Sequence, residues 1–227
     1  MKAPNWLLDL LFPPKCPFCA RVLDRPGVCA ACEKTLPWTE ERDSLWELPD
    51  GLRCAAPLWY RGGARQGLLR LKFRGAPGAA EPLGALAAQC AAERLSGEFD
   101  TVTWVPVSKK RRRSRGYDQA ELLARAACRR WDTVPVRLLE KTRDNPAQSG
   151  LRDAAARWEN VRDAYRAVDP RAVEGRRILL VDDICTTGAT LCQCAAVLRR
   201  AGAAEVVCAA AARTPPDRSD APEEGAF

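Results

Sequence analysis

Runs of apolar residues separated by turn residues divide the chain into expected strands and helices. The unbroken apolar run Ile178–Val181 predicts a buried strand, because a strand covered on both faces shows no polar alternation. Mostly apolar segments predict further strands at Cys54–Tyr60, Thr101–Val107 and Glu205–Ala212. Apolar residues at helical spacing predict helices over Arg65–Phe73, Pro82–Leu95, Ala120–Arg130 and Leu191–Ala201. Together these elements predict an α/β fold with a parallel sheet flanked by helices.

The run Ile178–Val181 is followed at once by groups suited to a sugar phosphate. Asp182 and Asp183 come directly after it, and a turn of Thr186, Thr187, Gly188, Ala189 and Thr190 leads into the next helix. Carboxylates at the end of a parallel strand can accept hydrogen bonds from vicinal hydroxyls or help to hold Mg²⁺ through water. Backbone N–H groups at a helix N-terminus bind phosphate, and Gly188 would let the main chain approach the ligand.

Two other interpretations share parts of this pattern. One is an ordinary strand–turn–helix with a threonine cap, and the other is a Walker-B-like strand of a nucleotidase. The nucleotidase needs a phosphate-binding loop that contains Gly-Lys, and the sequence has no Gly-Lys pair. The acid pair and the phosphate turn occur together and in order, which favours a sugar-phosphate site.

Eleven cysteines and no histidine narrow the chemistry further. The absence of histidine excludes Ser/His and Cys/His catalysis. Cys16, Cys19, Cys29 and Cys32 form two Cys-x-x-Cys pairs separated by nine residues, which predicts one structural Zn²⁺ held by four thiolates. Four unpaired cysteines in a loop are the alternative. The odd cysteine count, and the lack of a secretory segment or of ~20 consecutive apolar residues, predict a cytoplasmic protein without membrane insertion.

The positive charge of the chain is concentrated in one short segment. Lysine and arginine total 36 against 29 acidic residues, and six of the 36 lie between Lys109 and Arg115. We expect a cationic loop here, at the end of the strand Thr101–Val107, where it would face pyrophosphate across the same crevice. Contact with nucleic acid is the alternative, alone or in addition.

A polar segment, Glu140–Tyr165, is rich in arginine and interrupted by proline and glycine. A long loop of this kind beside a sheet predicts a lid that closes over a bound diphosphate. The cations that would reach the diphosphate are Lys141, Arg143, Arg152 and Arg157. A mobile connector with solvated arginines is the alternative.

The composition also suggests how the chain is divided. Residues 1–50 would form the zinc module and a linker, and residues 51–212 the α/β domain. Residues 213–227, rich in Pro, Asp and Glu, would be a disordered tail.

These segments, in this order, resemble the ComF family, phosphoribosyltransferase-like proteins with an N-terminal zinc module that are associated with DNA uptake and use. The shared motifs, found between Cys16 and Arg213, are CPFC and CAAC; LKFRG at Leu71–Gly75; VPVS with SRGYDQAELLA; KTRDNPAQSGLRDAAARWENV; and RILLVDDICTTGATL. The last of these resembles the PRPP-binding motif of type I phosphoribosyltransferases. Asp118 stands where the family usually has Asn, and it adds a negative charge beside the expected pyrophosphate loop.

The resemblance implies a role for each motif. Asp182 and Asp183 would bind the ribose hydroxyls of PRPP, and Thr186–Thr190 would bind its 5-phosphate. The loop Val107–Gly116 would meet the Mg²⁺-pyrophosphate, with Val107, Ser108, Lys109, Arg115 and Gly116 as candidate contacts. Lys141–Val161 would be a flexible catalytic loop, and the candidate catalytic residues are Asp182, Asp183, Lys141 and Arg143.

Two classes of function remain open at this point. The first is an enzyme that transfers the phosphoribosyl group of PRPP to an acceptor that the sequence does not name. The second is a non-catalytic zinc-containing protein that retains the PRPP fold and works by binding single-stranded DNA or competence proteins.

Overall fold

A five-stranded sheet lies at the centre of the computed structural model, which describes residues 13–73, 75–144 and 163–215. In sheet order the strands are β1 (Leu45–Leu48), β2 (Leu52–Ala55), β7 (Glu205–Arg213), β6 (Arg177–Cys185) and β3 (Thr101–Trp104). β1 pairs antiparallel with β2, whereas the other neighbouring strands are parallel. The predicted α/β class with a mostly parallel sheet is therefore confirmed.

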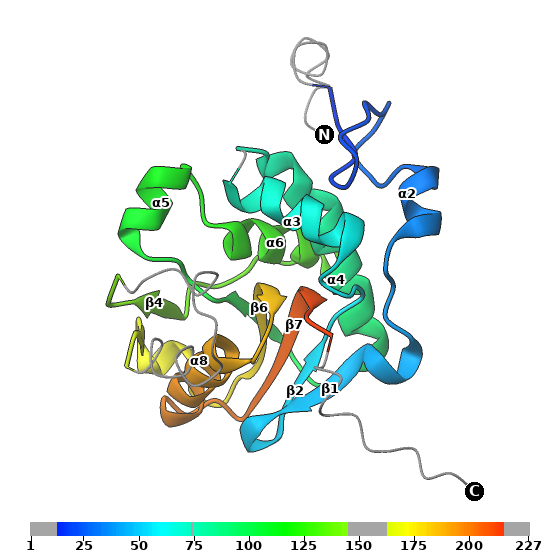
Figure 1. The fold of residues 1–227 in the computed structure, drawn as a ribbon. Helices are drawn as coiled ribbons and strands as arrows, with labels where there is room; N and C mark the ends of the chain where they lie inside the picture. Colours follow the sequence, from blue (N-terminus) through cyan, green and yellow to red (C-terminus); the bar gives the residue numbers. More distant parts are fainter. Residues whose placement is uncertain (1–12, 74, 145–162, 216–227) are drawn as a thin grey trace, which may run out of the picture.

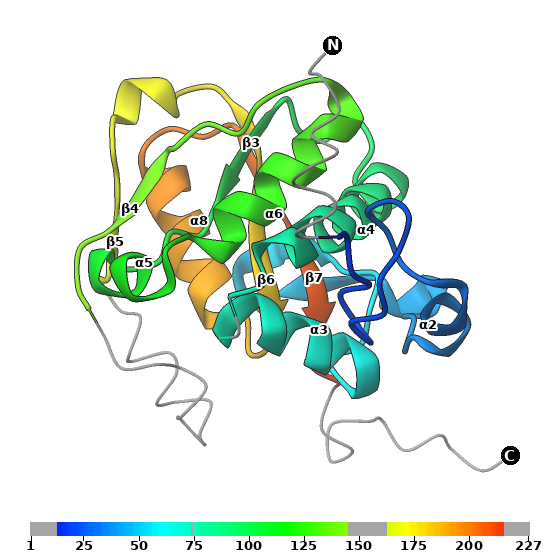
Figure 2. The same cartoon turned by 90° about the horizontal axis from the view of Figure 1, so that it is seen from above.

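Helices cover both faces of this sheet (Figures 1 and 2). α3 (Gly62–Phe73), α4 (Ala80–Arg94) and α6 (Gln119–Cys128) lie on one face, and α8 (Ala189–Arg200) lies on the other. Residues of β6 alternate between two apolar cores: Leu179 and Val181 pack on the side of the three helices, and Leu180 packs on the side of α8. Burial on both faces explains why this strand is an unbroken apolar run in the sequence.

Smaller elements surround the central layers. They are α2 (Ala30–Thr35), α5 (Lys109–Arg115), the antiparallel pair β4 (Leu139–Lys141) and β5 (Tyr165–Ala167), and the 3₁₀ turns Glu41–Asp43, Pro49–Gly51, Pro77–Ala79, Arg129–Trp131 and Pro170–Ala172. β4 and β5 lie at the two ends of the segment predicted as a lid. Its middle, residues 145–162 with Arg152 and Arg157, lies outside the described residues. None of the helices within the described ranges combines the length and apolar character needed to cross a bilayer.

The structure corrects two local predictions. β6 continues to Cys185 by pairing with β7, so that Asp182 and Asp183 lie within the strand and not after it. The basic run forms the helix α5 where a loop was expected. Ser108 caps its first turn, its Oγ accepting a hydrogen bond from Arg111 N at 3.3 Å, and Gly116 ends the helix with a φ of 82°.

Two segments that the sequence assigns to a linker and a tail are part of the main sheet. Residues 45–48 form β1 and pair with β2. Arg213 ends β7, and the N–H of Thr214 donates to Cys185 O at 2.9 Å. The guanidinium of Arg213 also lies 4.0 Å from the ring centre of Trp46 in β1. Contacts between residues distant in the sequence therefore hold both segments in place.

Candidate active site and metal centre

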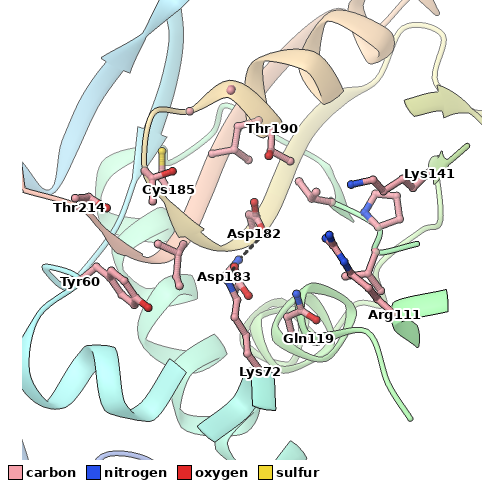
Figure 3. Close-up of a pocket in the computed structure, with 18 of the residues that line it drawn as sticks. Tyr60, Lys72, Arg111, Gln119, Lys141, Asp182, Asp183, Cys185, Thr190 and Thr214 are labelled. Atoms are coloured by element: carbon pink, nitrogen blue, oxygen red, sulfur yellow. Dashed lines mark hydrogen bonds and ion pairs between the residues drawn. The ribbon is translucent and has the colours of Figure 1, made fainter. Parts of the chain in front are cut away.

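A cavity of about 420 Å³ opens where β3, β6 and β7 reach their carboxyl ends. Ligands of parallel α/β sheets bind at this edge. Figure 3 shows the aspartates in the middle, Thr190 and Lys72 at opposite ends, Arg111 and Lys141 on one side, and Tyr60 and Thr214 on the other. The structure thus gathers predicted and unpredicted residues around the acid pair.

The two aspartates are held by different partners. Asp182 Oδ1 accepts a hydrogen bond from Asp183 N at 2.8 Å, and Asp183 Oδ1 lies 3.0 Å from Lys72 Nζ. Asp183 Oδ2 is buried without a hydrogen-bond partner among the described residues. Burial, followed by the charge of Asp183, raises the pKa of Asp182 well above its ordinary value, and the charge of Lys72 opposes the rise. A buried carboxylate oxygen without a partner marks a place for a hydrogen-bond donor or a cation.

The turn after β6 brings most of its predicted residues to the cavity. Thr186, Gly188, Ala189 and Thr190 line it, where α8 begins. Thr187 is not part of the lining, and its hydroxyl accepts a hydrogen bond from Ala189 N at 3.4 Å. The hydroxyl of Thr187 therefore supports the turn itself.

Gly188 is required by the backbone and by a neighbouring strand. Its φ is +76°, and a Cβ at this position would lie only 2.5 Å from Leu48 Cδ2. Leu48 belongs to β1, so a strand early in the chain packs directly beneath the turn. The sequence attributes this glycine to close approach of a ligand, whereas the structure assigns the space to Leu48.

α5 directs two of its cations into the cavity. Arg111 and Arg115 are four residues apart, so they share one face of the helix, and both line the cavity. Arg115 also donates to Gln119 Oε1 at 2.8 Å and lies 5.1 Å from the ring centre of Phe73. The remaining cations of the run, Lys109, Lys110, Arg112 and Arg113, are exposed. Treating the run as a loop missed Arg111, which the i, i+4 spacing would have paired with Arg115.

Lys141 reaches the cavity from β4. Its Nζ lies 3.2 Å from Tyr165 Oη and 5.0 Å from the centre of that ring. Burial, followed by the charge of Arg111, lowers the pKa of Lys141. A half-buried ammonium beside an arginine suits an anionic ligand, because negative charge would offset the repulsion between the two cations.

The other predicted site residues fall into two groups. Val107 lines the cavity, whereas Ser108, Lys109, Gly116 and Arg143 do not. The hydroxyl of Ser108 donates to Asp144 Oδ1, which ties the start of α5 to the chain after β4.

Asp118 is a structural residue, and its carboxylate does not line the cavity. Oδ1 accepts hydrogen bonds from Ala120 N at 3.1 Å and Glu121 N at 3.3 Å, which caps α6. Oδ2 accepts from Val107 N at 2.9 Å and anchors the segment after β3. Burial raises the pKa of Asp118, while the N–H groups of Val107 and Glu121 oppose the rise. The carboxylate of Asp118, which was expected beside the pyrophosphate, instead binds backbone N–H groups of the segment after β3 and of the first turn of α6.

Several lining residues were not predicted from the sequence. They are Tyr60, Arg65, Leu69, Lys72, Phe73, Val105, Pro106, Arg111, Gln119, Tyr165, Ile184, Cys185, Leu191 and Thr214. Arg65, Leu69 and Lys72 recur at helical spacing, which could have identified them as one face of α3. Nothing local in the sequence places this face beside Asp183.

The four predicted zinc ligands converge in the N-terminal module. The sulfur atoms of Cys16, Cys19, Cys29 and Cys32 all lie within 4.8 Å of one another, and those of Cys19 and Cys29 are 3.6 Å apart. Tetrahedral zinc with bonds of ~2.3 Å would separate its sulfur ligands by ~3.8 Å, whereas a disulfide needs ~2.05 Å. The cluster therefore fits a structural zinc site.

Two of these thiols differ in acidity. Burial raises the pKa of Cys16, but the backbone N–H groups of Cys29, Cys19 and Phe18 stabilise its thiolate and lower the pKa to about 7. Burial and the neighbouring thiols raise the pKa of Cys32. Crowded thiols resist simultaneous ionisation, and a divalent cation removes that conflict.

Family models match both parts of the chain. Residues 87–225 match the phosphoribosyl transferase domain, and residues 7–43 match the double zinc ribbon domain. Together with the parallel sheet and the four-cysteine cluster, these matches define a type I phosphoribosyltransferase-like protein with an N-terminal zinc module.

Curated relatives narrow the class. Competence protein ComFC of Bacillus subtilis is 31% identical over 186 residues, which cover 78% of this chain and 68% of that protein. Competence protein F of Haemophilus influenzae is 35% identical over 105 residues, 45% of each chain. DNA utilization protein YhgH of Escherichia coli K12 is 36% identical over 111 residues, 47% of this chain and 46% of the relative. The chain thus spans about half the length of the YhgH relatives that it matches. It belongs to the ComF-like family.

One solved structure with partial similarity is the allosteric regulatory enzyme of purine biosynthesis. It is 25% identical with a TM-score of 0.43, over 63% of this chain and 30% of that chain.

Proposed function

We propose that the cavity binds PRPP together with Mg²⁺ and that the protein transfers the phosphoribosyl group to an acceptor with release of pyrophosphate. The observation that carries this proposal is the buried Oδ2 of Asp183, which has no partner in the described residues and lies beside a second carboxylate in a cavity lined by cations. Carboxylate oxygens accept hydrogen bonds from the vicinal hydroxyls of a ribose. The turn Thr186–Thr190 lies at the N-terminus of α8 and would hold the 5-phosphate.

The cations support departure of pyrophosphate. The bond from the anomeric carbon to the pyrophosphate oxygen would break with its electron pair on the leaving group, and the acceptor would then bond to the same carbon. Arg111, Arg115 and Lys141 would neutralise the departing charge. Mg²⁺, for which the two aspartates offer oxygen ligands, would supply further charge stabilisation when bound. An acid or base histidine is not required for this departure.

Calorimetry with PRPP and MgCl₂ tests the site directly. Wild type should bind with the heat of a single site, and the Asp182→Asn/Asp183→Asn variant should show no binding at millimolar PRPP. Asp132→Asn is the matched control, because Asp132 is exposed and its left-handed φ of 47° also suits asparagine. Equal affinity in wild type and the double variant would refute the site. Pyrophosphate release with candidate bases then separates transfer from binding alone.

A second function rests on the outward face of α5. Four of its cations, Lys109, Lys110, Arg112 and Arg113, are exposed outside the cavity lining and together favour a polyanion such as single-stranded DNA. Replacing these four residues by glutamine should weaken single-strand binding and flatten its salt dependence while PRPP binding is kept. Unchanged DNA affinity in that variant would exclude α5 as the contact.

We also propose a cytoplasmic location, because none of the eleven cysteines, all of which lie within the described residues, forms a disulfide. Competence proteins are the partners that the family suggests.

A further inference from the structure

α3 carries two sets of residues on nearly opposite sides. Gly63 and Gly67 face the N-terminal module, whereas Arg65 and Leu69 line the cavity. Each cavity residue follows a module-facing residue by two positions, which corresponds to ~200° around an α-helix. Figure 2 shows α3 next to the dark-blue N-terminal segment on one side. The helix is therefore a direct connection between the zinc module and the cavity.

The module contacts α3 through the residues between its first two cysteines, Pro17 and Phe18. Phe18 is 2% exposed, and a Cβ on Gly67 would lie 2.9 Å from Phe18 Cδ1 and 3.2 Å from Pro17 O. Arg70 donates from Nη1 to Pro17 O at 3.1 Å and to Phe18 O. We call the segment Cys16–Cys19 the first knuckle. It is docked in a notch that only glycine at position 67 leaves open.

We propose that the docked first knuckle fixes α3 so that Lys72 meets Asp183, and that the zinc module thereby sets the affinity of the cavity for its sugar phosphate. The identity of the ligand rests on the proposed function. Lys72 follows Gly67 by five residues and Arg70 by two, and its Nζ lies 3.0 Å from Asp183 Oδ1. Zinc held by the four thiolates would keep the first knuckle in shape, and Phe18 and Arg70 connect that cysteine cluster to the helix that carries Lys72. Lys72 is the residue positioned by this contact.

A competing anchor holds the last turn of the same helix. The hydroxyl of Tyr117 donates to Leu71 O at 2.5 Å, and this bond also holds the last turn of α3. If this bond alone fixed Lys72, a disturbance at the first knuckle would not reach the cavity. The test therefore perturbs each anchor separately.

Gly67→Ala is the perturbing variant, and Gly63→Ala is its matched control. Alanine favours a helix over glycine at either position, so α3 itself should form in both. The added methyl meets the Phe18 ring at position 67, but at position 63 it has only ordinary contacts, at 3.6 Å from Leu36 Cδ2. Calorimetry with PRPP and MgCl₂ should show affinity about tenfold weaker for Gly67→Ala and within about twofold of wild type for Gly63→Ala. Metal analysis should find one zinc per chain in both, since no cysteine has changed.

A double-mutant cycle identifies the route of the effect. In a Lys72→Met background, Gly67→Ala should cause no further loss of PRPP affinity. Adding Phe18→Leu to Gly67→Ala removes the clashing ring and should restore most of the affinity. A full Gly67→Ala effect in the Lys72→Met background would overturn the proposal. The proposal would also be overturned if Gly67→Ala bound PRPP with wild-type affinity while Tyr117→Phe bound it more weakly, because Tyr117 alone would then fix Lys72.

A measurement without PRPP separates this proposal from the proposed function. The rate at which an amine-reactive reagent modifies Lys72, followed by mass spectrometry, should rise in Gly67→Ala and stay unchanged in Gly63→Ala. If wild type does not bind PRPP, the proposed function fails, and the labelling rate still tests the positioning of Lys72. Equal labelling in wild type and both variants would overturn the positioning itself. If Gly67→Ala does not fold, Phe18→Leu alone should raise the labelling rate by loosening the same contact, and an unchanged rate would overturn the proposal.

Discussion

The ion pair between Lys72 and Asp183 should contribute to the free energy of unfolding. Lys72→Met tests this contribution, because it removes the cation and keeps a side chain of similar length. The two charged atoms are 3.0 Å apart, and the side chains are 21% and 5% exposed. At 3.0 Å and an effective dielectric constant of ~20, the gross attraction is ~5.5 kcal/mol. Dehydration and the partial exposure of Lys72 reduce the net value, so we expect Lys72→Met to lower the free energy of unfolding by about 3 kcal/mol.

Asp182 gives this prediction its pH dependence. Burial and Asp183 raise the pKa of Asp182, and the charge of Lys72 opposes that rise. A carboxyl whose pKa is raised by folding binds a proton more readily in the folded state, so it costs stability as pH rises above the unfolded value of ~3.9. Without Lys72 the pKa of Asp182 rises further. The loss of stability in Lys72→Met should therefore be larger at pH 8 than at pH 5.

Urea unfolding followed by tryptophan fluorescence at both pH values measures the effect. Lys110→Met is the control, because Lys110 is 85% exposed and 3.9 Å from Asp144, and no measurable loss is expected there. The Lys72→Met/Asp183→Asn variant should regain most of the lost stability, since the uncompensated buried charge is gone. Our reasoning is refuted if the double variant is no more stable than Lys72→Met, or if the loss is the same at pH 5 and pH 8.

Three further predictions concern the metal, the cations and the helix cap. Cys16→Ser should reduce bound zinc well below one per chain in metal analysis and should speed hydrogen exchange across α2. Cys90→Ser is the control and should keep the metal. Zinc retained in Cys16→Ser would contradict the ligand set. Burial lowers the pKa of Lys141 from its ordinary 10.5, so its ammonium loses the proton, and wild-type PRPP affinity should decline, as the pH is raised towards 10.5. Lys141→Met should bind PRPP about tenfold more weakly at pH 7 and should not show this alkaline decline. Asp118→Ala removes the acceptor of three backbone N–H groups and should cost about 2 kcal/mol in thermal unfolding; a loss below ~0.5 kcal/mol would show that the cap is dispensable.

The sequence determined by itself those features whose physical signal is local. A strand covered on both faces must be apolar throughout, so Ile178–Val181 and its neighbours predicted a buried parallel sheet. The spacing within Cys16–Cys32 predicted the thiol cluster, because two short turns bring four sulfur atoms together. The acid pair and the turn Thr186–Thr190 are only two residues apart, so the sequence alone placed both near the carboxyl end of one strand, although it ended that strand too early.

The tertiary structure decided which distant residues meet these segments. Lys72 belongs to the LKFRG motif found in the sequence, yet only the packing of α3 against the end of β6 brings its ammonium into an ion pair with Asp183. Position 188 requires glycine because a Cβ there would clash with Leu48, a residue of a strand that the sequence assigned to a linker. Folding of the basic run into α5 selected Arg111 and Arg115 for the cavity and turned the other cations outward. Such pairings depend on how whole elements pack across the sheet, and no periodicity within a single segment carries that information.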